Sequence, residues 1–73
     1  MTIKDESILA ARRAIGARLK ELREARNLTQ EDFGNLVDVD RATIAKIEQG
    51  RWNFGIDTLS LFVQKLEAKV SIK

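Results

Sequence analysis

The stretch of sequence that decides the fold spans residues 28–50 and reads LTQEDFGNLVDVDRATIAKIEQG. Its pattern predicts two short helices, at about 30–37 and at about 41–48. Thr29 is a suitable N-cap for the first helix. Asp32 stands three residues later in the capping-box position, although Glu or Gln is preferred there. An acidic side chain in the first turn also interacts favourably with the helix dipole, which supports this start.

A tight turn at residues 38–40, with the sequence Asp-Val-Asp, separates the two helices. Asp40, at the end of this turn, is a suitable N-cap for the second helix, and Gly50 is its predicted stop. The apolar side chains expected to face a core from these two helices are Phe33, Leu36, Val37, Ile44 and Ile47.

A longer helix is predicted before this stretch, from about residue 8 or earlier to about residue 26. Its apolar stripe, at helical spacings, consists of Ile8, Ile15, Leu19 and Leu22. Asn27 is suited to end this helix, and residues 1–7 are expected to form a flexible N-terminal arm. A longer helix followed by two short helices with a three-residue turn between them is the helix-turn-helix arrangement.

A fourth helix is predicted after a loop at 51–55, beginning at Asp57 and ending near Glu67. Its apolar side consists of Leu59, Phe62, Val63 and Leu66. The tail at 68–73 then alternates apolar and polar residues, which is typical of a strand. Because no other strand is predicted, this one could pair only with the same segment of a second copy, antiparallel across a two-fold axis. A disordered tail and a continuation of the fourth helix are the alternatives.

The composition bounds the function. The chain has 73 residues, a net charge of +2, and neither Cys nor His. These absences remove disulfides, zinc sites with the usual soft ligands, thiol nucleophiles and imidazole bases. We therefore expect a single small domain with no enzymatic activity, no metal and no cofactor. A chain of this size is stabilised only marginally on its own, and oligomerisation is the support that remains.

The distribution of charge is more informative than its sum. Residues 27–40 carry four acids and no base, whereas residues 41–52 carry three bases and one acid. No apolar stretch of the signal-peptide kind follows the N-terminal charges, and no segment approaches the ~20 apolar residues of a membrane span. We therefore expect a cytoplasmic protein with no membrane partner.

The helix-turn-helix residues also resemble a known family, the Cro/C1 (xenobiotic-response-element) family of DNA-binding domains. The residues that carry the resemblance are 28–33, Val39 and 41–50. The resemblance covers about residues 15–67. It departs from the family pattern at Gly34, where the family usually has Ala, and at Asp38, where it usually has Gly. It implies an all-α, four-helix, lambda-repressor-like domain over residues 8–67.

This resemblance implies a sequence-specific transcriptional regulator, a repressor that binds double-stranded DNA as a homodimer on two half-sites about one helical turn apart. Its implied base-contacting residues are Arg41, Ala42, Ala45 and Lys46, because Arg and Lys donate to guanine and Ala contacts the thymine methyl group. The resemblance also implies a phosphate contact for Gln30, at the start of the first short helix, and the further phosphate candidates are Thr29, Thr43, Arg51 and Asn53. The resemblance also implies an internal salt bridge between Arg23 and Glu48, which would tie the first helix to the third.

The C-terminal strand resembles that of HipB-type antitoxins, which end in a strand that forms the dimer. Its pairing residues here are Lys69, Val70, Ser71 and Ile72. The alternative function is therefore an antitoxin that binds a toxin protein and represses its own operon. For Trp52, packing at the core edge or in the dimer is favoured over stacking on DNA or anchoring a partner. RNA binding is less favoured because few aromatic residues are present to stack on bases.

Overall fold

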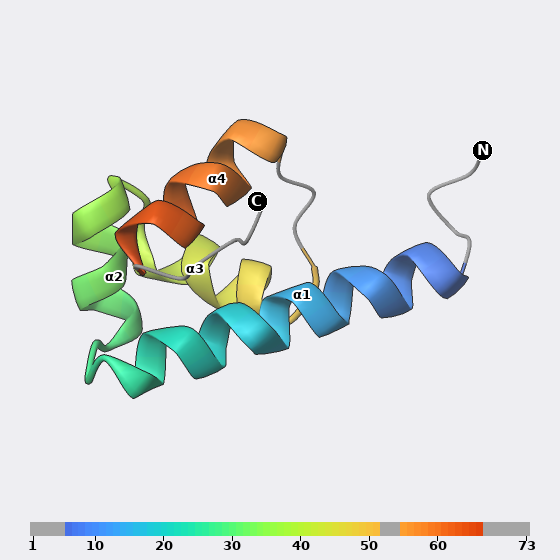
Figure 1. Cartoon of the computed structure of the whole chain (residues 1–73), viewed down its shortest axis with the longest axis horizontal. Helices are drawn as coiled ribbons and strands as arrows, with labels where there is room; N and C mark the ends of the chain where they lie inside the picture. The colour runs from blue at the N-terminus through green and yellow to red at the C-terminus, as the bar shows by residue number, and fades with distance from the viewer. Residues whose placement is uncertain (1–5, 52–54, 67–73) are drawn as a thin grey trace, which may run out of the picture.

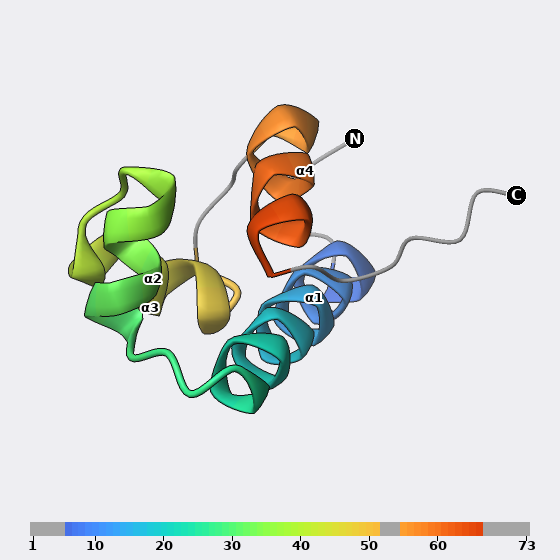
Figure 2. The same cartoon turned by 60° about the vertical axis from the view of Figure 1, so that its left-hand side comes forward.

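The computed structural model describes residues 6–51 and 55–66, and these ranges contain four helices and no strand. The helices are α1 (Glu6–Ala25), α2 (Gln30–Val37), α3 (Arg41–Glu48) and α4 (Ile56–Lys65). Figure 1 shows α1 along one edge of the molecule, with its N-terminal half extending past the other helices. Helices α2 and α3 lie side by side in both views (Figures 1 and 2). This is the small all-α helix-turn-helix fold that the sequence predicts.

The two helix starts that the sequence predicts by capping are confirmed. The Asp32 amide donates to the Thr29 hydroxyl at 3.0 Å, and the Thr29 amide donates back to the Asp32 carboxylate at 3.2 Å. A complete capping box therefore forms with Asp in the place of the preferred Glu. At the start of α3, the Thr43 amide donates to the Asp40 carboxylate at 3.3 Å. Each cap satisfies backbone donors that a helix start leaves without partners.

The first helix begins within its predicted range, at about residue 8 or earlier, whereas the fourth begins one residue earlier than predicted. Helix α1 begins at Glu6, so residues 6 and 7 of the expected arm are helical. Helix α4 begins at Ile56 and uses Gly55 as its N-cap, with no side-chain hydrogen bond. The expected start at Asp57 was one residue late, because no capping side chain marks the first residue of this helix.

The ends of the first three helices are confirmed by a left-handed residue after each. Asn27 has a φ of 58°, Asp38 of 59° and Gly50 of 74°. After α1, the Leu28 amide donates to the carbonyl of Arg23 at 3.3 Å, which closes a Schellman-type stop. Asp adopts this conformation more readily than most residues, so Asp38 can stand where glycine would be usual.

The core lies where the four helices meet. Its fully or nearly fully buried apolar residues are Leu19, Phe33, Val37, Ile44, Ile47, Phe62 and Leu66. The rings of Phe33 and Phe62 meet edge to face, with centroids 5.0 Å apart and an interplanar angle of 80°. This geometry suits the quadrupoles of two aromatic rings. The ring pair therefore joins α2 directly to α4.

Two residues that the sequence predicts in the core are exposed instead. Ile15 is 41% exposed and Leu36 is 50% exposed. The residues that α1 and α2 bury are Gly16, Leu19, Arg23, Phe33, Gly34 and Val37. The prediction counted only apolar side chains, whereas α1 approaches α3 through Gly16. Ile15, next to this glycine, is turned toward solvent.

Several predictions concern residues outside the described ranges. These are the dimerisation strand with Lys69, Val70, Ser71 and Ile72, the phosphate candidate Asn53, and Trp52. Within residues 6–51 and 55–66, no helix has the length and apolar character needed to cross a membrane.

Candidate nucleic-acid interface

Helix α3 presents two different faces. Its inner face is formed by Ile44, Ile47 and Glu48, which are 0%, 1% and 8% exposed. Elsewhere on its surface, three of the four predicted base-contacting residues are exposed and one is half-buried. These four residues are Arg41, Ala42 and Lys46, which are exposed, and Ala45, which is half-buried. The packing of α3 therefore leaves the predicted reading face open.

The exposed face has the chemistry and the size for the major groove. An α-helix fits this groove, and Arg or Lys side chains can donate to guanine O6 and N7. Arg41 is the first residue of α3, at the end of a recognition helix that reaches the base edges. Within the described ranges, its guanidinium makes no ion pair. Ala42 follows it and offers a methyl group suited to contact with thymine.

The two predicted phosphate contacts at the start of α2 differ in how they are held. Thr29 is exposed, and its hydroxyl oxygen accepts the Asp32 amide as part of the cap. Gln30, the first residue of α2, is half-buried, and its Nε2 donates to a Glu48 carboxylate oxygen at 3.1 Å. The sequence did not predict this second contact, because eighteen residues separate the two side chains.

The remaining described phosphate candidates lie near the two ends of α3. The Thr43 hydroxyl donates to Asp40 at 2.6 Å, so its single proton is engaged in the cap. This hydrogen bond lowers the pKa of the Asp40 carboxyl below its ordinary value. Arg51 is exposed after α3, and its Nη1 donates to the Gln49 side chain at 3.1 Å. Arg51 is therefore better placed than Thr43 to reach a phosphate.

A buried ion pair lies behind this surface. Arg23 and Glu48 are 6% and 8% exposed, and they meet through two hydrogen bonds of 2.6 and 3.1 Å. A further Arg23 nitrogen donates to the carbonyl of Leu28 at 2.6 Å. The hydrogen bonds with Glu48 raise the pKa of the Arg23 guanidinium above its ordinary value. The pair implied by the resemblance is thus present, and it connects α1, the following loop and α3.

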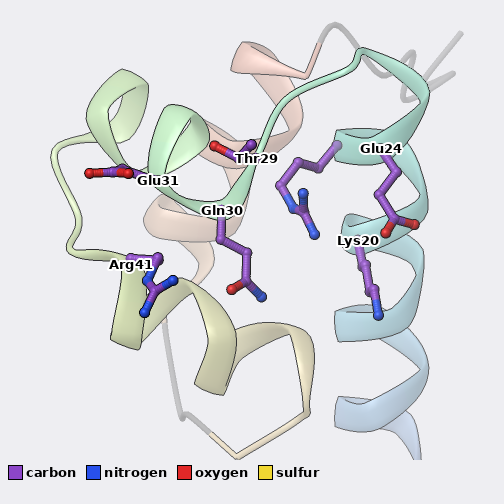
Figure 3. Close-up of a pocket in the computed structure, with 7 residues that line it drawn as sticks. Lys20, Glu24, Thr29, Gln30, Glu31 and Arg41 are labelled. Atoms are coloured by element: carbon purple, nitrogen blue, oxygen red, sulfur yellow. The ribbon is translucent and has the colours of Figure 1, made fainter.

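A pocket of about 540 Å³ opens between α1 and the starts of α2 and α3. Its lining residues are Lys20, Arg23, Glu24, Thr29, Gln30, Glu31 and Arg41. In Figure 3 the head groups of Lys20, Gln30 and Arg41 extend to the same side, while the Glu31 carboxylate points away from them. Among the described residues, no group of acidic side chains could hold a metal ion.

The pocket brings a residue from α1 beside the helix-turn-helix residues. Lys20 was not predicted as a site residue, although it lies three positions before Arg23 and therefore on the same side of α1. Arg41 and Gln30, in contrast, were predicted for different contacts, one to a base and one to a phosphate. Their common side in Figure 3 indicates that one ligand surface could meet both.

Comparison with known proteins identifies the family of the chain. A family model described as a helix-turn-helix domain matches residues 14–70, which include most of α1 and all of α2, α3 and α4. Searches of curated proteins and of solved structures returned no match. The matched region covers most of the chain and contains both the buried ion pair and the exposed face of α3. The chain is therefore a member of the helix-turn-helix domain family.

Proposed function

We propose that this protein is a sequence-specific DNA-binding regulator that inserts α3 into the major groove. The observation that carries the proposal is the outer face of α3, where Arg41, Ala42 and Lys46 are exposed. Arg41 supports it further, because a cation in the first turn is disfavoured by the helix dipole. Arg41 lowers the local stability of α3, and a contact with DNA would account for its presence there.

Phosphate contacts on both sides of α3 would set its register on the duplex. Gln30 and Thr29 would act on one side, at the N-terminus of α2, where free amide groups favour an anion. Arg51 would act on the other side, and Thr43 and Asn53 are weaker members of the proposed set. Contacts of this kind position a protein on DNA, whereas Arg41, Ala42, Ala45 and Lys46 would read its sequence.

A homodimer acting as a repressor is the form of regulator that we propose. Two copies would read two half-sites, separated by about one helical turn, and block access to a promoter. Residues 68–73 would join the copies as an antiparallel pair of strands. On this proposal the protein works by binding alone, in the cytoplasm and on the chromosome, without a catalytic step.

Binding to DNA can be tested with the full chain. Fluorescence anisotropy would use DNA from the region upstream of its own gene and a scrambled duplex of the same length. Arg41→Ala with Lys46→Ala is expected to weaken specific binding by at least about tenfold, since each good base contact contributes roughly 1–3 kcal/mol of discrimination. The control, Arg18→Ala with Lys65→Ala, removes the same charge from two other exposed positions.

The outcomes separate specific recognition from general attraction. Equal losses in the two double variants would show that only net charge matters, and would contradict the proposed reading face. Sedimentation of a chain that lacks residues 68–73 tests the dimer separately. If that chain remains a dimer with unchanged affinity for DNA, the proposed strand pairing is wrong.

The antitoxin alternative adds a protein partner to the same DNA-binding activity. It is supported by the resemblance of the C-terminal residues to antitoxins that end in a dimer-forming strand. The product of the neighbouring gene is the candidate toxin, because an antitoxin gene lies beside the gene of its toxin. Co-purification of the neighbouring gene product with this chain would favour the alternative, and an isolated gene would count against it.

A further inference from the structure

We propose that Glu48 is a positioning residue for DNA binding, because it holds the Gln30 amide in the orientation that donates to a phosphate. This inference rests on the proposed function and gives a second role to an ion pair that otherwise only connects α1 to α3. It concerns three side chains from three helices, namely Arg23, Gln30 and Glu48.

The first step is the shared carboxylate of Glu48. One of its oxygens accepts Arg23 Nε at 2.6 Å. The other oxygen accepts both Arg23 Nη2 and Gln30 Nε2, each at 3.1 Å. Glu48 is only 8% exposed, so the bonds form where competition from water is small. Gln30 is therefore attached to a buried charged group and not only to its own helix.

The second step is the polarity of the Gln30 amide. A carboxylate only accepts hydrogen bonds, so it selects the NH₂ end of the amide and excludes the carbonyl oxygen. The amide nitrogen carries two protons, and Glu48 uses one of them. The second proton remains for a phosphate oxygen, which also only accepts. Without Glu48, the amide could rotate and present its oxygen, which an anion repels.

The third step is the rigidity of the support. Arg23 is 6% exposed and also donates to the carbonyl of Leu28 at 2.6 Å, immediately before the cap of α2. The same guanidinium thus holds both Glu48 and the chain that leads into Gln30. Figure 3 shows the Gln30 side chain extending into the pocket between α3 and α1. A side chain fixed before binding loses less rotamer freedom when the ligand arrives.

The test replaces the ion pair by apolar residues, with Arg23→Met and Glu48→Leu made together. Replacing a buried pair by apolar residues of similar volume is often neutral or stabilising, so the fold should persist. Gln30 loses its acceptor in this variant. We expect an unchanged or raised melting temperature and a roughly 2- to 10-fold weaker affinity for specific DNA, the range of one hydrogen bond of modest net strength.

A double-mutant cycle separates positioning from a structural role. Gln30→Ala should weaken binding in the wild-type background but have little effect in the background of Arg23→Met with Glu48→Leu, where Gln30 is no longer held. Gln64→Ala, at an exposed position on α4, is the matched control and should have no effect in either background. If Gln30→Ala weakens binding by the same factor in both backgrounds, Glu48 does not position Gln30 and the inference is overturned.

A second measurement uses the wild-type chain and does not depend on the variant folding. In ¹⁵N-resolved NMR spectra, the Gln30 side-chain amide is assigned by its loss in Gln30→Ala. We expect this amide group to be less mobile in ¹⁵N relaxation measurements than the exposed Gln64 amide before DNA is added. A Gln30 amide as mobile as that of Gln64 in the free protein would overturn the inference. Failure of the proposed function would look different, because the wild-type chain would then not discriminate its upstream DNA from the scrambled duplex.

Discussion

The eight residues of α3 are divided between an inner face and an outer face, and different contacts account for the residues of each. On the inner face, Ile44, Ile47 and Glu48 are buried, and each is accounted for by contacts within the molecule. On the outer face, packing explains neither Arg41 nor Ala42, which are both exposed. The buried residues of α3 are therefore accounted for by the fold, whereas its exposed residues remain available to a ligand.

The first turns of α2 and α3 show the same contrast. Helix α2 begins with Glu31 and Asp32, which interact favourably with the helix dipole. Helix α3 has no acidic residue in its first turn and begins with Arg41 instead. Both helices have good N-caps, so the difference is confined to the exposed side chains. The first-turn side chains of α2 therefore stabilise their helix, whereas Arg41 at the start of α3 slightly destabilises its helix.

The largest effect is expected on the inner face, at Glu48. Glu48→Ala would leave the buried Arg23 charge without its partner, which costs about 3–5 kcal/mol. A loss of this size is a large part of the free energy of unfolding of a small domain. Urea titration followed by circular dichroism measures it. Gln49→Ala, at the exposed neighbour, should change stability by less than about 0.5 kcal/mol, and similar losses in both variants would contradict the contrast.

The next effect concerns the residue of α1 that faces the inner side of α3. A Cβ at Gly16 would collide with the carbonyl oxygen of Ile47 and would lie 2.6 Å from that of Glu48. Backbone atoms cannot rotate away as a side chain can, so Gly16→Ala should cost about 1–3 kcal/mol. Thermal and urea unfolding measure the loss.

Helix propensity acts in the opposite direction and needs its own control. Alanine is about 1 kcal/mol better than glycine within a helix. Ala17→Gly, at the exposed neighbouring position, measures this contribution in α1 itself. If Gly16→Ala instead stabilised the chain by as much as Ala17→Gly destabilises it, the close approach of the two helices would be disproved.

The fold could be predicted from the sequence wherever its determinants are local. The caps at Thr29 and Asp40 and the stops at Asn27 and Gly50 depend on neighbouring residues, so these helix boundaries were correct. The rotation of α1 was missed because it depends on Gly16 meeting α3, a contact between residues far apart in the chain.

The candidate site was predictable to the same extent. The exposure of Ala42 and Lys46 follows from the helical period, since Ile44 and Ile47 occupy a different side of α3. Arg41 stands three residues before Ile44 and is exposed as the first residue of the helix. The bond between Gln30 and Glu48 does not follow from any local pattern. Lys20 was missed for a similar reason, because its place in the pocket depends on how α1 crosses the two short helices.

A smaller effect of opposite sign is expected on the outer face, at Arg41. Arg41→Ala removes a cation from the positive end of the α3 dipole, so stability should rise by about 0.3–1 kcal/mol or less while specific DNA binding falls. Lys65→Ala is the matched control, because it removes a cation from the last turn of α4, where the dipole favours one. Lower stability in both variants would contradict the view that Arg41 is retained for a ligand.

The smallest effect tests the cap that both faces of α3 share. The Thr43 hydroxyl lowers the pKa of the Asp40 carboxyl, so the folded state favours the ionised form. This contribution is complete above the ordinary pKa of Asp, about 3.9, and is lost as the pH falls through the lowered value. Asp40→Asn keeps a good N-cap that does not titrate. The melting temperature of the wild type should therefore fall more steeply than that of Asp40→Asn below about pH 4. If the melting temperatures of the wild type and of Asp40→Asn fall in parallel with pH, the two hydrogen bonds from Thr43 to the ionised Asp40 add no stability to the start of α3.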